Sequence, residues 1–186
     1  PCEELAALLR ISAGGASADA AAVCVELVRA AFKFTDTFEP NADHPTLGAL
    51  QASWPLLIET GRRFASVKVA SALADVYSSA MVSLRQMLSA QLPQILTLMR
   101  DIFAATPNTG PLRAVSQALE LYGVEPAEAD ALADALEQLS EVTCRWLSGA
   151  GAAEADPELA TAFFQLCHKG LVFRPAVMNS LSTMPA

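Results

Sequence analysis

The sequence predicts an all-α protein, and three observations lead to this prediction. Apolar residues recur at helical intervals along the chain, and no stretch alternates apolar and polar residues over the length of a strand. Runs rich in Gly, Pro, Ser, Asn and Asp separate these periodic stretches, as loops separate helices. Of the 186 residues, 53% are apolar and 17% are charged, a composition that can form a buried core and that excludes a disordered chain.

Eight helices are expected, over residues 1–11, 17–34, 46–64, 67–87, 91–105, 111–122, 126–148 and 157–173. The first has a short leucine stripe and ends at the Gly/Ser run SAGGAS. The second has apolar residues at i, i+4, i+7 and i+8 and precedes a loop rich in Pro, Asn and Asp. On the third we expect Trp54 in the core and a kink or local break at Pro55, because proline removes a backbone donor. The fourth keeps the i, i+3, i+4, i+7 spacing along its length.

The four later helices are marked chiefly by their ends. The fifth has Pro93 in its first turn, where proline is tolerated, and it ends before the loop TPNTGP. The sixth stops at Gly123, a residue type that favours helix C-caps. The seventh opens with Pro126 and closes on the run SGAGAA. The eighth begins with Asp156 as its N-cap and Pro157 at its first position.

These helices form four consecutive pairs, which give approximate repeats over residues 1–34, 46–87, 91–122 and 126–173. Antiparallel pairs that start about 35–45 residues apart are typical of HEAT-type solenoids. An ordinary helical bundle with short loops fits the same pattern and stays open as the alternative. The prediction is one right-handed HEAT-type α-solenoid of about four antiparallel helix pairs. Phe163 and Phe164 are adjacent on the last helix, so one of them is expected to be partly exposed and to contact a further repeat.

Composition and charge narrow the function classes. The chain has 12 Lys and Arg against 20 Asp and Glu, a net charge of −8, which argues against direct nucleic-acid binding. No segment reaches the roughly 18–20 uninterrupted apolar residues of a membrane span, so no membrane partner is expected. The start at Pro1, without the features of a signal peptide, indicates a piece of a longer protein. The four cysteines, Cys2, Cys24, Cys144 and Cys167, form no CxxC motif, so we expect reduced thiols and a cytoplasmic or nuclear location.

Residues for catalysis are sparse. The two histidines, His44 and His168, lie far apart in the sequence and match no catalytic motif. Cys167 and His168 are neighbours on one predicted helix, and such neighbours point about 100° apart, so they do not face each other. The sequence has no closely spaced set of Cys and His ligands and no glycine-rich phosphate motif. We expect neither enzymatic activity, nor a cofactor, nor a bound metal.

Acidic residues are concentrated between residues 125 and 158, where nine of them stand against Arg145 alone. Asp130, Asp134, Glu137 and Glu141 fall on one face of a predicted helix. Two interpretations stay open: a solvated outer face that keeps the protein soluble, or a surface that receives a basic partner. Like charges at i, i+4 slightly destabilise a helix, which favours a functional reason for retaining them.

Three strings of the sequence, taken in order, match a known pattern over nearly the whole chain. They are FKFTDTFEPNADHP followed by ASWPLLIET, then AQLPQILTLMRDIFAATPNTGPLRAVSQALELYG, then DPELATAFFQLCHKGLVFRPAVM. They include His44–Pro45, Trp54–Pro55, Tyr122–Gly123 and Arg174–Pro175. Their order and spacing resemble the transportin-SR and importin-thirteen branch of the importin-β superfamily of nuclear transport receptors.

The resemblance implies a fragment from the C-terminal part of such a receptor. It would be a curved scaffold that binds protein cargo without chemistry of its own and shuttles between cytoplasm and nucleus. Cargo would be released when GTP-bound Ran binds other parts of the parent chain, and nucleoporins would be further partners. A structural HEAT-like subunit of another protein assembly stays open as the second function class.

The resemblance also points to one helix as the cargo wall. In this branch the helix corresponding to residues 67–87 lines the concave side and carries arginines that read phosphorylated Arg-Ser domains. The candidate partner-binding residues are therefore Lys68, Ala72, Asp75, Ser78 and Val82, with Arg113 from elsewhere in the chain. At the positions of those arginines this chain has Ala72, Asp75, Ser78 and Val82. Phosphate recognition needs clustered bidentate donors, which these four residues do not provide. We therefore expect no binding of phosphorylated Arg-Ser segments, and weak, salt-sensitive binding of a basic partner.

Overall fold

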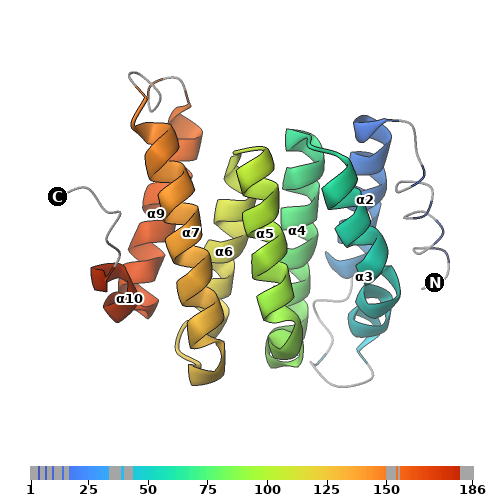
Figure 1. The fold of residues 1–186 in the computed structure, drawn as a ribbon. Coiled ribbons are helices and arrows are strands. Elements are labelled where there is room, and N and C mark those ends of the chain that lie inside the picture. The colour runs from blue at the N-terminus through green and yellow to red at the C-terminus, as the bar shows by residue number, and fades with distance from the viewer. Residues whose placement is uncertain are drawn as a thin grey trace. The chain divides into compact units, whose positions relative to one another are not determined.

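The computed structural model describes residues 17–33, 44–149 and 156–180, together with Glu4, Ala7, Arg10, Gly14, Glu39 and Glu154. All regular structure in this part of the chain is helical, which confirms the all-α prediction (Figure 1). The helices are α2 (Ala18–Lys33), α3 (Pro45–Arg63), α4 (Val67–Leu84), α5 (Leu92–Ala105), α6 (Thr109–Tyr122), α7 (Ala129–Leu147), α9 (Pro157–Phe173) and α10 (Pro175–Ser180), with 3-10 turns η1 (Arg85–Gln91) and η2 (Pro126–Glu128). The chain divides into two compact units, Pro1–Gln91 and Leu92–Ala186.

Most predicted helix ends agree with the structure to within a few residues, and there are three differences. The helix expected over 67–87 ends at Leu84, because Arg85 adopts φ 48°, a conformation that an α-helix does not allow. The helix expected from residue 126 opens with the 3-10 turn η2. The short helix α10 follows Arg174 and was not expected. The helix expected over residues 1–11 lies largely outside the described residues.

In the first unit, α4 is the central helix and packs against both α2 and α3. The apolar residues of α4 are buried on several sides, among them Leu73, Val76 and Tyr77. Helices α2 and α4 run parallel to each other. Their N-terminal ends lie side by side, since Lys68 near the start of α4 donates to Asp19 near the start of α2 at 2.7 Å. Consecutive helices, by contrast, are antiparallel, as the short connection from α3 to α4 requires.

Trp54 and Pro55 both differ in part from their expected roles. Trp54 is half-buried, and its ring meets the fully buried Tyr77 edge-on with ring centroids 5.5 Å apart. Helix α3 continues through Pro55 without a break. Pro55 and Gln51, whose carbonyl loses its donor, are both exposed, so water can satisfy that carbonyl.

In the second unit, α5 packs on α6 and α7, and α6 packs most extensively on α9. Helices α6 and α9 run parallel, because Lys169 donates to Glu120 at 2.8 Å near the C-terminal ends of both. Just beyond these ends, the Arg174 guanidinium donates to the Glu125 carbonyl. Both pairs join residues 49 positions apart, the separation that also joins Asp19 to Lys68.

Side chains fix several helix ends. Asp156 accepts from the Leu159 amide at 3.0 Å, which confirms it as the N-cap of α9. His44, not predicted as a cap, accepts from the Thr46 amide through Nδ1 at 3.2 Å. Gly123 occupies the C-cap of α6 with φ −61°, so it is not required for a left-handed conformation. It allows close packing instead, since an added Cβ would lie 2.6 Å from the Cβ of Phe173.

One stretch, Val67–Ala105, is long and apolar enough to cross a membrane by length and composition alone. This differs from the expectation that no segment comes close to a membrane span. In the structure, 61% of the 18-residue window that gives this result is buried. The core helix of a soluble protein passes the same test, because a helix packed on several sides also needs few charged residues.

Candidate functional site

The partner-binding face expected on α4 is only partly accessible. Lys68 is exposed and held by Asp19, and Val82 is 41% exposed. Asp75 and Ser78 are half-buried. Ala72 is 2% exposed, because this side of α4 packs in the core, so it offers little surface to a partner.

Asp75 lies close enough to α2 to act on its charges. The pKa of Arg29 is raised mainly by its hydrogen bond to Glu26, and the negative charge of Asp75 raises it further. The carboxylate of Asp75 thus acts on a cation of its own unit. Among the candidate residues of α4, Lys68 and Val82 offer the most accessible surface.

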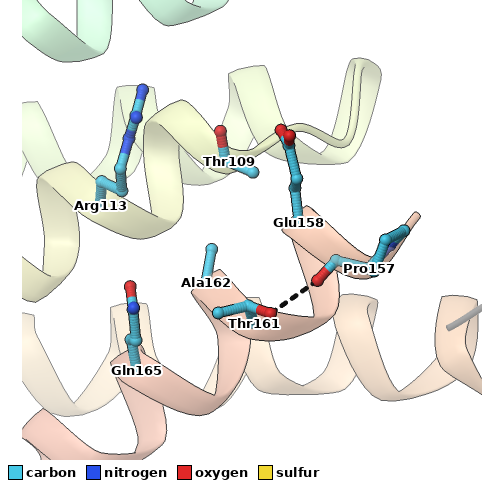
Figure 2. A pocket seen from close by; sticks show the side chains of 7 residues that line it. All are labelled: Thr109, Arg113, Pro157, Glu158, Thr161, Ala162 and Gln165. Atoms are coloured by element: carbon cyan, nitrogen blue, oxygen red, sulfur yellow. Dashed lines mark hydrogen bonds between the residues drawn. The ribbon is translucent and has the colours of Figure 1, made fainter.

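Arg113 belongs to the second unit, where it lines a hollow between the parallel helices α6 and α9. This first hollow has a volume of about 330 Å³. Its lining residues are Thr109 and Arg113 from α6, and Pro157, Glu158, Thr161, Ala162 and Gln165 from α9 (Figure 2). The Thr161 hydroxyl is occupied by the Pro157 carbonyl, to which it donates at 2.7 Å.

A second hollow of about 570 Å³ continues the first along the same two helices, because both are lined by Thr161 and Gln165. Its other lining residues are Ser116, Phe164, His168 and Lys169. We call the two hollows together the α6–α9 groove. The expectation of one exposed phenylalanine is confirmed: Phe163 is 4% exposed and Phe164 is 66% exposed.

The groove follows one register of α6 against α9. Thr109 stands beside Glu158 and Ser116 beside Gln165, with the same 49-residue separation as the Glu120–Lys169 ion pair. Along α9 the groove extends from Pro157 to Lys169, about 18 Å at roughly 1.5 Å per helical residue. That length accommodates about five residues of an extended peptide at roughly 3.3 Å each.

The acidic face predicted on helix 126–148 lies on α7, and all four of its carboxylate residues are exposed. Glu141 is paired with Arg145 at 2.7 Å, and Asp134 accepts from Gln138. These are exposed pairs that contribute little to stability. The face therefore remains both well solvated and strongly negative.

Cys144 and Cys167 lie close enough to interact electrostatically, but they form no disulfide. Cys24, Cys144 and Cys167 are unpaired, and Cys2 lies outside the described residues. Burial raises the pKa of the Cys167 thiol to about 11, so it is protonated at neutral pH and is a poor nucleophile. Within the described residues, no three His, Cys, Asp or Glu side chains are grouped so as to hold a metal ion.

Nothing in the sequence indicated that Ser116 and Gln165 would line a groove. Both are ordinary polar residues on helices, and only the register of α6 against α9 brings them together. Their separation of 49 residues differs from the helix-pair spacing estimated from the sequence, so pattern analysis could not align them.

No family model matches the chain, and no curated protein sequence matches it.

Proposed function

We propose that this chain is a HEAT-type scaffold segment of a nuclear import receptor that binds protein cargo without chemistry of its own. In this proposal the parent chain shuttles between cytoplasm and nucleus, passes nucleoporins, and releases cargo when GTP-bound Ran binds other repeats. The resemblance of three ordered sequence strings to transportin-SR and importin-thirteen supports this assignment.

The packing of alternate helices is the single observation that supports the scaffold most. In the first unit α4 runs parallel to α2, and in the second unit α9 runs parallel to α6. Each parallel pair is joined by an ion pair between an acidic residue and a lysine 49 residues further along the chain. A stack of repeats requires this arrangement, because second helices must pack on second helices. A bundle of antiparallel hairpins does not require it. We propose that the packing within each unit is that of a HEAT-type solenoid.

The accessible chemistry supports a protein partner rather than a phosphorylated Arg-Ser segment. Helix α4 has no arginine at the positions aligned with the phosphate-reading arginines of that branch. The carboxylate of Asp75 would repel a phosphate group. The exposed acidic face of α7 favours a basic, unphosphorylated partner at low salt.

The test is a pull-down with the full-length parent, with and without GTP-loaded Ran, using a basic peptide and its phosphoserine counterpart as probes. The proposal expects the basic peptide to be retained and to be released by GTP-loaded Ran. Retention that is indifferent to Ran would instead support a structural subunit of a static assembly. Preferential retention of the phosphopeptide would show that the α4 alignment is wrong.

A further inference from the structure

The half of the α6–α9 groove formed by the second hollow is rich in hydrogen-bond donors. Ser116 is one of the residues that line the hollow of about 570 Å³, and its buried Oγ has no hydrogen-bond partner among the described residues. Gln165, His168 and Lys169 add N–H donors around the same hollow. A buried hydroxyl without a partner is costly, so a ligand group that bonds to it gains free energy.

The charge of this half favours an anion. Its six lining residues include Lys169 and His168 and no carboxylate. Lys169 does pair with Glu120 at 2.8 Å, but the two side chains are 34% and 49% exposed. Such a partly exposed pair contributes less than about 1 kcal/mol, so an incoming carboxylate can share or replace Glu120. Glu158, the carboxylate of the adjoining hollow, lies at the other end of the groove.

An aromatic platform stands beside these donors. The ring of Phe164 is exposed, and it leans on the buried ring of Phe163 with centroids 5.9 Å apart. This support restricts the ring and lowers the entropy lost when a partner covers it. Exposed aromatic side chains of this kind are common anchors of protein interfaces.

We propose that the α6–α9 groove binds a short segment of a protein partner in which a carboxylate side chain adjoins a large apolar side chain. The carboxylate accepts hydrogen bonds from Ser116, Gln165 and Lys169, and the apolar side chain covers Phe164. This surface is distinct from the acidic face of α7 and takes a partner of opposite charge. The inference does not depend on the transport assignment.

The experiment is a titration of the full chain, labelled with ¹⁵N, with the acetylated heptapeptide Gly-Ser-Glu-Phe-Glu-Ser-Gly. Three matched peptides replace the two Glu by Gln, the two Glu by Lys, or the Phe by Ala. We expect the first peptide to shift the amide signals of Ser116, Gln165 and His168, and each replacement to weaken binding. Phe164→Ala should weaken binding about fivefold or more, equivalent to roughly 1 kcal/mol.

Two variants separate binding from folding. Val172→Ala removes an exposed apolar side chain from the same helix, away from the groove lining, and should leave affinity unchanged. Ser116→Ala should weaken peptide binding while leaving the free protein as stable or more stable, which a purely structural role would not produce.

Equal binding of the Lys peptide, or the absence of shifts at the groove, would overturn the inference. Shifts at the same residues that depend on protein concentration without peptide would identify a second copy as the occupant and also overturn it. Each of these outcomes leaves the Ran-dependent release of cargo by the parent chain unaffected.

Discussion

Replacing Tyr77 with phenylalanine should stabilise the first unit, although most substitutions of fully buried residues destabilise. Tyr77 is 0% exposed, and its hydroxyl has no hydrogen-bond partner among the described residues. Burial also raises the pKa of this phenol, which reflects the cost of placing a charge in the same surroundings. Tyr77→Phe removes the hydroxyl and keeps the edge-on ring contact with Trp54.

The expected gain follows from two opposing contributions. Leaving a buried donor unpaired costs about 1–3 kcal/mol, and the substitution removes that cost. The hydroxyl leaves a void of roughly 10 Å³, which costs only about 0.2 kcal/mol at roughly 24 cal/mol per Å³. We therefore expect the free energy of unfolding to rise by about 1–2 kcal/mol.

The two tryptophans allow this to be measured in the first unit alone. Trp54 lies in that unit and Trp146 in the other, so a Trp146→Phe background leaves Trp54 as the only fluorescent tryptophan. Urea unfolding followed by Trp54 emission then gives the midpoint and slope with and without Tyr77→Phe. The slope should stay constant while the midpoint rises.

Tyr122 provides the matched control. It is also fully buried, in the second unit, but its hydroxyl is not among the buried unpaired groups. Tyr122→Phe should therefore be neutral or destabilising. A loss of 1 kcal/mol or more for Tyr77→Phe would refute the reasoning, because it would mean that a bound water or another group pairs with the Tyr77 hydroxyl.

Three further predictions concern packing, backbone conformation and pH. Gly123→Ala should destabilise the second unit by about 1–3 kcal/mol in urea unfolding, because the new Cβ meets Phe173, whereas Gly48→Ala, with no atom within 4 Å, should be neutral or stabilising. Arg85→Gly should be about 1 kcal/mol more stable than Arg85→Ala, since only glycine accepts φ 48° without strain; equal stabilities would argue against that conformation. The free energy of unfolding of the second unit should fall by about 2 kcal/mol between pH 9 and 11, because the raised pKa of Cys167 in the folded state means that the thiol ionises first in the unfolded state. Cys167→Ala should reduce this fall, and an unchanged pH dependence would exclude the thiol as its cause.

The helices were predictable because their signals are local. Apolar spacing, the N-cap at Asp156 and the first-turn proline Pro157 depend on residues within one or two turns, and the structure agrees with them closely. One boundary was missed, although its cause is also local. Helix α4 ends early through the conformation of Arg85, and no residue type in that stretch announces a stop.

The candidate site was less predictable, because it depends on how helices are arranged side by side. The sequence identified Phe164 as one of two phenylalanines of which only one could be buried, a question of helical phase. It gave no information on Ser116, whose significance arises from a neighbour 49 residues away. The burial of Ala72 could not be predicted for the same reason, because a small residue on a helix fits an exposed wall and a crowded core equally well.

The 49-residue offset between parallel helices has a consequence for the rate of folding. The main packing in each unit joins helices that are separated by an intervening helix, so contact order is higher than in a bundle of hairpins. Closing a loop of that length costs about 3 kcal/mol of chain entropy, from roughly (3/2)RT ln n, before the contacts form. The α3–α4 and α5–α6 hairpins are therefore expected to form early and to leave much of their apolar surface uncovered. Each unit completes its core only when α2 or α9 arrives, so substitutions on these two helices should change the unfolding rate more than the folding rate.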